Sequence, residues 1–127
     1  MLFAHWMLLV ASFLPIIATS FAKSGKGYDN SQPRAYIETL GANTLQRRMA
    51  WAESNSWEAL MMFAPAVLLA TILNVDALVL NLCAGGFIVA RIVYLVCYAK
   101  NLASARSAVW SIGLLFVIGL YVAAALV

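Results

Sequence analysis

The chain has 127 residues, of which 65% are hydrophobic and only 10% are charged, and its mean hydropathy is +0.90. Soluble domains contain roughly 45–50% apolar and about 25% charged residues, so this composition excludes a water-soluble globule and a disordered chain. The formal net charge is +3, but no aromatic-interleaved basic stripe accompanies it, so we expect no nucleic-acid partner. The composition indicates an integral membrane protein.

Four segments are apolar enough to cross a bilayer, whose hydrocarbon core requires about 20 helical residues. The second is expected to be one long helix, because the amphipathic run Thr44–Glu58 leads directly into the apolar run Ala59–Leu73. Asn43 and Gln46 form its predicted capping box. We therefore predict an all-α four-transmembrane-helix bundle, a single domain over residues 1–127 with spans at about 2–22, 44–73, 77–99 and 107–127.

The connections between these spans carry turn and capping residues. Asp76 is expected to cap the third span after a tight turn, and Ser104 is expected to cap the fourth. The longer connection after the first span contains Gly25 and Pro33, which favour a flexible or partly ordered connector. Because the residues before the first apolar run include no Lys or Arg, we expect this span to be retained rather than cleaved as a signal peptide.

Basic residues are concentrated in two of the three connections. They are Lys23, Lys26, Arg34, Arg47 and Arg48 between the first two spans, and Lys100 and Arg106 around the third connection. Because short loops rich in Lys and Arg stay in the cytoplasm, we predict that both termini lie outside. The first and third loops are then cytoplasmic, in a bacterial inner membrane or an equivalent membrane.

Several polar residues fall within or beside the predicted spans, where burial of a charge is costly and points to function. They are Arg48, Asn55 and Glu58 on the second span, Arg91, Tyr94 and Tyr98 on the third, and Arg106 with Ser107 at the start of the fourth. Steps of three, four and seven residues place those of the second span on one face and those of the third span on one face. No comparable cluster of metal ligands occurs, so no metal is expected.

Arg106 is expected at a helix N-terminus, where the macrodipole disfavours a cation and free backbone N–H groups attract an anion. With Arg48 and Arg91, partly balanced by Glu58, it predicts a cationic, tyrosine-lined pocket for a small anionic ligand. A structural interpretation is equally consistent with the spacing. In that interpretation Arg48 lies at the interface, Arg91 pairs with Glu58, and the tyrosines extend toward the interface.

These residues form a pattern that resembles the membrane-associated proteins in eicosanoid and glutathione metabolism, the MAPEG family, which includes the microsomal glutathione transferases. Three motifs carry the resemblance, and it covers the chain from about Leu2 to its end. They are N-x-x-E from Asn55 to Glu58, preceded by Arg48; R-x-x-Y-x-x-x-Y from Arg91 to Tyr98; and Arg106-Ser107.

The resemblance implies a homotrimer that binds glutathione, as co-substrate, between neighbouring subunits near the cytoplasmic side. The residues that would hold the peptide are Arg48, Asn55, Glu58, Arg91, Tyr94 and Tyr98. Arg106 would favour the thiolate form of the sulfur, and Ser107 would lie beside that sulfur. Since the thiolate is the nucleophile, the implied function is a membrane-bound glutathione transferase or glutathione-dependent peroxidase. A lipophilic electrophile or hydroperoxide would arrive through the membrane lipid.

The chain departs from the family pattern at three positions. Trp51 stands where many members have an arginine, Ala59 stands where an aromatic residue often follows the glutamate, and Pro65 comes later than in the eicosanoid synthases. These departures favour a general-purpose or bacterial-type member. They leave open whether glutathione is the thiol, and Arg47 or Arg48 is the candidate substitute for the missing arginine.

Two other functions fit four short spans. A small proton-coupled transporter requires a titratable carboxylate near the membrane centre, and Glu58 is the nearest candidate. A non-catalytic membrane scaffold would use the small residues within Ala84–Ala90 for close helix contacts. Proton-driven efflux of a cationic dye would favour the transporter, and a trimer that binds no thiol would favour the scaffold.

Overall fold

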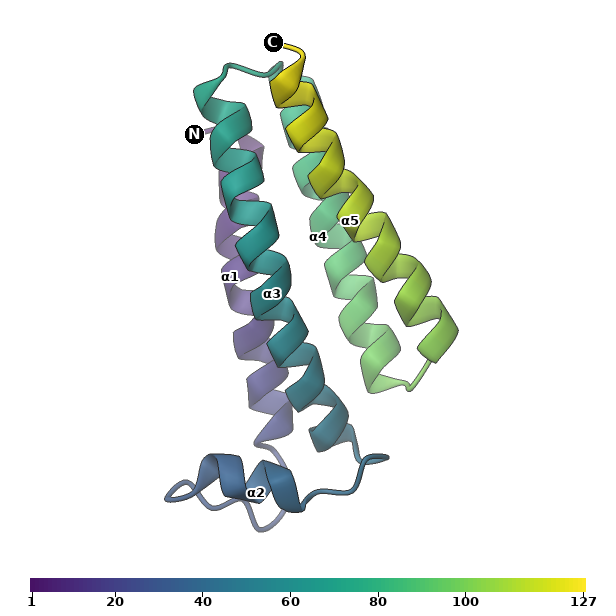
Figure 1. Cartoon of the computed structure of the whole chain (residues 1–127). Coiled ribbons are helices and arrows are strands. Elements are labelled where there is room, and N and C mark those ends of the chain that lie inside the picture. The colour runs from purple at the N-terminus through teal and green to yellow at the C-terminus, as the bar shows by residue number, and fades with distance from the viewer.

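The computed structural model describes all residues 1–127 and contains helices and no strands (Figure 1). The helices are α1 Phe3–Ala22, α2 Pro33–Thr39, α3 Leu45–Ile72, α4 Ala77–Ala99 and α5 Ala103–Ala125. All except the short α2 are long and apolar enough to cross a membrane. The predicted all-α architecture with four spans is confirmed, including the continuous second span, α3.

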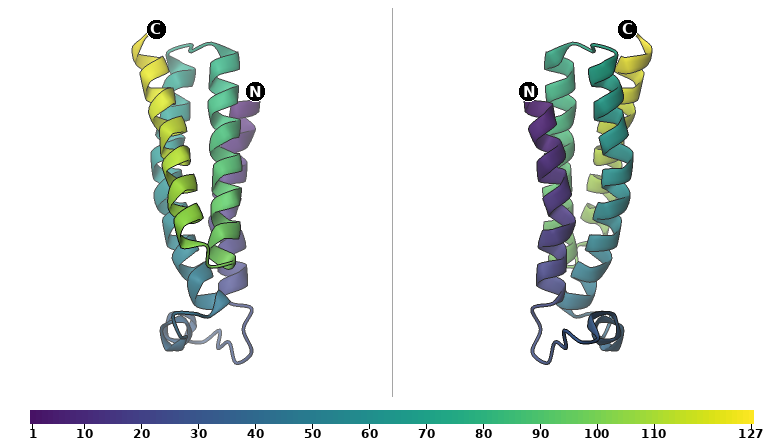
Figure 2. Two further views of the ribbon diagram at one scale, coloured as in Figure 1. Left: turned by 90° about the vertical axis from the view of Figure 1, so that its right-hand side faces the viewer. Right: turned by 90° about the vertical axis from the view of Figure 1, so that its left-hand side faces the viewer.

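The four long helices form two antiparallel pairs. Helix α1 lies beside α3, and α4 lies beside α5, and the two pairs pack together along the bundle (Figures 1 and 2). Both termini and the α3–α4 turn lie at one end, whereas α2 and its flanking loops lie at the other. Helix α3 extends further toward α2 than the α4–α5 turn does, and Arg48 in its second turn meets the end of α4.

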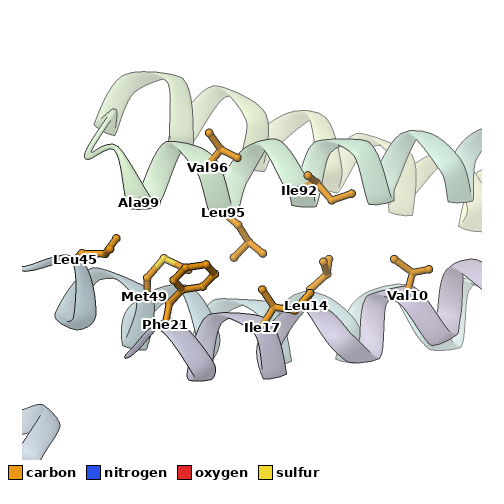
Figure 3. A pocket seen from close by; sticks show the side chains of 10 residues that line it. All are labelled: Val10, Leu14, Ile17, Phe21, Leu45, Met49, Ile92, Leu95, Val96 and Ala99. Carbon is orange, nitrogen blue, oxygen red and sulfur yellow. The ribbon is translucent and has the colours of Figure 1, made fainter. Parts of the chain in front are cut away.

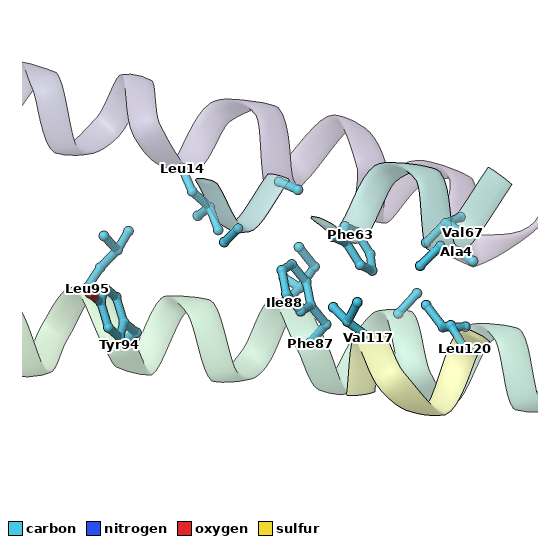
Figure 4. Packing of buried hydrophobic residues seen from close by; sticks show 14 of the residues in the cluster. Ala4, Leu14, Phe63, Val67, Phe87, Ile88, Tyr94, Leu95, Val117 and Leu120 are labelled. Carbon is cyan, nitrogen blue, oxygen red and sulfur yellow. The ribbon is translucent and has the colours of Figure 1, made fainter. Parts of the chain in front are cut away.

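Small side chains let the helices of the core approach closely. The buried face of α3 includes Ala52, Ala59, Ala66 and Ala70, and small residues are the usual means of close helix packing in membranes. Larger residues fill the middle of the bundle (Figure 4), where the rings of Phe63 and Phe87 stack with centroids 4.0 Å apart and planes 10° apart.

An asparagine with a left-handed backbone follows two of the long helices. Asn74 follows α3 and Asn101 follows α4, with φ angles of 57° and 56°. The left-handed conformation after a helix lets the next residue bond back to the last turn, and the N–H of Leu102 donates to the carbonyl of Cys97 at 2.8 Å. These turns reverse the chain within a few residues and produce the antiparallel pairs.

The helix starts follow the predictions only in part. Asp76 caps α4 as predicted, since its carboxylate accepts bonds from two N–H groups of the first turn at 3.0 and 3.3 Å. The capping box of Asn43 and Gln46 is wrong. Thr44 has the extended backbone of a cap residue, and its hydroxyl accepts from the N–H of Arg47 at 3.2 Å.

Helix α5 begins about one turn earlier than predicted. The sequence suggested a span from residue 107 capped by Ser104, but the helix starts at Ala103, and its cap residue, Leu102, makes no side-chain bond. The reason is the turn at Asn101, which redirects the chain at once. As a result, the backbone N–H of Arg106 donates to the carbonyl of Leu102 at 2.9 Å, and the free N–H groups of the helix start belong to the residues before Arg106.

Candidate functional site

Two arginines and two tyrosines form a continuous column between α4 and α5. The Cζ atom of Arg91 lies 4.1 Å from the ring centre of Tyr94, and the Tyr94 and Tyr98 rings meet edge to face with centroids 5.5 Å apart. The Cζ atom of Arg106, on α5, lies 4.5 Å from the ring centre of Tyr98. Contact between a guanidinium and an aromatic face is stabilising, so the rings hold both cations in defined positions.

Arg91 is buried inside the bundle, with 3% of its surface exposed. Its side chain donates one hydrogen bond, to the hydroxyl of Ser56 on α3 at 3.4 Å. The ion pair with Glu58 that the sequence suggested is replaced by this bond, because the Glu58 side chain is exposed on α3.

A cavity of about 350 Å³ opens at the other end of the column. Its lining residues are Tyr94, Arg106, Ser107, Trp110 and Ser111. The volume lies at the lower end of the roughly 300–1,000 Å³ typical of small-molecule sites. The Arg106 guanidinium makes no hydrogen bond within the chain and rests only on Tyr98, so its five N–H donors remain available to an anion.

The amide of Asn55 leaves one hydrogen-bonding position open. Its Nδ2 atom donates to Oε2 of Glu58 at 3.4 Å, whereas its Oδ1 atom is buried and has no partner. A buried acceptor without a donor is unfavourable by about 1–3 kcal/mol. This arrangement of the Asn55–Glu58 motif therefore leaves the acceptor capacity of Asn55 unused.

Arg48 lies apart from the column. Its Nε atom donates to the carbonyl of Tyr98 at 3.0 Å, its Nη2 atom donates to the carbonyl of Ala99 at 2.8 Å, and its Nη1 atom contacts the carbonyl of Asn43. A cation is favourable at a helix C-terminus, where the carbonyls lack partners. Arg48 thus links the start of α3 to the end of α4 by hydrogen bonds. The sequence had instead predicted that it shares one pocket with Arg91 and Arg106.

Arg47 lies on the side of α3 that carries Trp51. Its Cζ atom is 5.4 Å from the ring centre of Trp51, and its side chain also donates to the carbonyl of Ile37 in α2. Both residues line an open polar cavity of about 600 Å³ between α2 and α3. Many members of the family that the sequence resembles have an arginine where this chain has Trp51, and Arg47 and Arg48 were the candidates to replace it. Of the two, Arg47 lies beside Trp51.

Three residues of the site were missed from the sequence. Trp110 and Ser111 line the cavity with Arg106 and Ser107, and their spacing of three to five residues was the available signal. Ser56 was missed because it occupies the first unspecified position of the N-x-x-E motif. It is the one polar residue on the buried face of α3, and that position on the apolar stripe was its signal.

No group of three or more His, Cys, Asp and Glu side chains is arranged to hold a metal ion. The fold and the column instead define a class: a four-helix integral membrane protein with a cationic, tyrosine-lined site near one end of the bundle. The MAPEG family profile matches residues 1–126, and the chain belongs to the MAPEG family. None of the curated proteins or solved structures compared with the chain matches it.

Proposed function

We propose that this protein is a membrane-bound glutathione transferase or glutathione-dependent peroxidase. The observation that carries the proposal is Arg106, a guanidinium held against Tyr98 with no hydrogen-bond partner of its own, beside Ser107 in the cavity between α4 and α5. Such a group is suited to an anionic sulfur. Membership of the MAPEG family supports the same function.

Arg106 would act on the thiol of the co-substrate. A free thiol has a pKa of about 8.5, and a neighbouring cation lowers it, so glutathione bound here would be a thiolate near neutral pH. In a transferase, the sulfur forms a bond to an electrophilic carbon, and the leaving group departs with its electron pair. In a peroxidase, the sulfur takes the terminal oxygen of a hydroperoxide and releases an alcohol, and a second glutathione then yields the disulfide and water.

The remaining residues would hold the peptide, which carries two carboxylates and one ammonium group. Tyr94, Tyr98 and the charge of Arg91 suit a carboxylate, and the exposed Glu58 suits the ammonium. If its side chain turned outward, Asn55 would complete its hydrogen bonds with a donor from the peptide or from a second subunit. A homotrimer with the site between subunits belongs to this proposal, as does an orientation with the α2 end in the cytoplasm.

The test is the ultraviolet absorbance of the thiolate when purified protein is mixed with glutathione. We expect a thiolate signal below pH 8 that Arg106→Ala abolishes. The matched control, Arg34→Ala, removes an arginine from the exposed α2 and should leave the signal unchanged. Equal signals in wild type and Arg106→Ala, or no signal in folded wild type, would refute the proposal. A trimer that binds no thiol would favour a scaffold.

A further inference from the structure

A second cavity lies on a different side of α4. It is a groove of about 480 Å³ between α1, α3 and α4, and all ten residues that line it are hydrophobic (Figure 3). Val10, Leu14 and Phe21 line it from α1, and Ile92 and Val96 from α4. It shares no lining residue with the cavity of Arg106 and Ser107.

The groove has the length of one membrane leaflet. From Val10 to Phe21 it follows eleven residues of α1, or roughly 16 Å at about 1.5 Å per residue. Half of a hydrocarbon core of about 30 Å is roughly 15 Å. The end at Phe21 lies toward α2 and the bundle surface, and the end at Val10 lies nearer the middle of the bundle (Figures 1 and 3).

The volume indicates what fits. About 480 Å³ of free space extends along this length, which suits a narrow, flexible occupant. A single hydrocarbon chain is such an occupant, and a lining without polar groups offers it only favourable burial.

Positive charge lies where the groove reaches the bundle surface. Ala99 lines the groove there, and its carbonyl accepts a bond from the Arg48 guanidinium. Three of the five N–H groups of Arg48 donate to backbone carbonyls, and the other two remain free to bind another acceptor. Lys100 follows Ala99 and is exposed. A phosphate beside these two cations would be favourably placed.

We propose that the groove binds one acyl chain of an anionic membrane phospholipid, with the headgroup phosphate at Arg48 and Lys100. The lipid belongs to the leaflet at the α2 end. It fills the space between α1 and α4 and lies outside the candidate site, because Ile92 and Val96 occupy a different face of α4 from Arg91 and Tyr98. This inference does not depend on glutathione chemistry.

The first experiment is native mass spectrometry of the purified protein after exchange into micelles that contain phosphatidylglycerol or phosphatidylcholine with identical chains. Val96→Phe fills the groove, whereas Val93→Phe is the matched control, since Val93 is similarly exposed on α4 (42% against 46%) but does not line the groove. We expect one phosphatidylglycerol per subunit in wild type and Val93→Phe, and at least a tenfold loss in Val96→Phe. Equal retention by wild type and Val96→Phe, equal loss in both variants, or equal retention of the two lipids would overturn the proposal.

A second experiment uses wild type alone, so that a folding defect of a variant cannot obscure the result. Phosphatidylglycerol with a photoreactive diazirine at the end of one acyl chain is crosslinked to the protein in vesicles. We expect crosslinks centred on Val10 and Leu14, at the deep end of the groove. Crosslinks spread equally over exposed residues elsewhere, such as Leu82 and Leu115, would show general lipid contact and overturn the proposal.

Discussion

The guanidinium of Arg106 on α5 lies against the ring of Tyr98 on α4, with its Cζ atom 4.5 Å from the ring centre. Residues on two helices thus fix the cation that we propose to face the sulfur. A contact of this type contributes about 0.5–2 kcal/mol, enough to select one position of a long side chain.

Replacement of Tyr98 by leucine should therefore weaken thiolate formation, because the guanidinium loses the surface that positions it. We expect the thiolate signal at pH 7 to fall about 2- to 30-fold, the range that corresponds to this contact energy. Tyr98→Phe keeps the aromatic face and should retain most of the signal. Titration of the thiolate absorbance with glutathione measures both variants, and equal losses in the two would assign the effect to the hydroxyl instead.

Arg91→Met should separate function from stability. Arg91 is buried with a single hydrogen bond at 3.4 Å, and an apolar side chain of similar volume avoids the desolvation cost of a buried, unpaired charge. We expect thermal unfolding in detergent to change by less than about 1 kcal/mol, while glutathione affinity falls at least tenfold. A large loss of stability in Arg91→Met would show that the cation is structural.

Arg48→Ala should have the opposite effect, because the variant frees the carbonyls of Tyr98 and Ala99 at the end of α4. Hydrogen bonds to a charged group contribute about 1.5–3 kcal/mol, and we expect a loss of unfolding free energy of that order. The thiolate signal of the folded fraction should persist. Its disappearance at unchanged stability would return Arg48 to the binding site that the sequence suggested.

Gly86→Ala should disturb the contact between α4 and α5. A Cβ atom at this position would lie 2.3–2.8 Å from three ring atoms of Phe116, so the ring has to move, at a cost of about 1–3 kcal/mol. Gly119→Ala is the matched control in the same helix pair, since its nearest contact would be Sγ of Cys83 at 3.7 Å. Melting curves of both variants test the difference, and equal melting temperatures would contradict it.

Asp76→Ala should lower stability by removing the cap of α4. The Asp76 carboxylate accepts two backbone bonds at 3.0 and 3.3 Å, and loss of such a cap typically costs about 1 kcal/mol. Asp76→Asn keeps an acceptor oxygen and should unfold close to wild type. A wild-type melting temperature for Asp76→Ala would show that the tight α3–α4 turn fixes the helix start without the cap.

Most of the architecture was predictable because it depends on local properties of the chain. Apolar runs of sufficient length form spanning helices wherever they occur, since no other backbone arrangement satisfies its hydrogen bonds in lipid. The continuous α3 and the cap at Asp76 follow from that pattern and from one residue type. The start of α5 was not predictable, because it depends on the left-handed turn at Asn101.

The candidate site was predictable only as a set of residues. Spacing along α4 placed Arg91, Tyr94 and Tyr98 on one face, and the structure stacks them in that order along one column. Spacing carried no information on Ser56 as the partner of Arg91, nor on Arg47 as the neighbour of Trp51. The contact between Ser56 and Arg91 joins different helices. The contact between Arg47 and Trp51 depends on the conformation of a long side chain near a helix end.

The sequence by itself determined that this protein crosses a membrane four times and that cations and tyrosines gather near one end, since hydropathy and helical periodicity are properties of each segment alone. Only the tertiary structure decided what each arginine does. Arg48 closes the end of α4, Arg91 is buried against Ser56, and Arg106 keeps its donors free. The physical reason is that a guanidinium on a long side chain takes its partner from neighbouring helices, and their relative placement is fixed by packing.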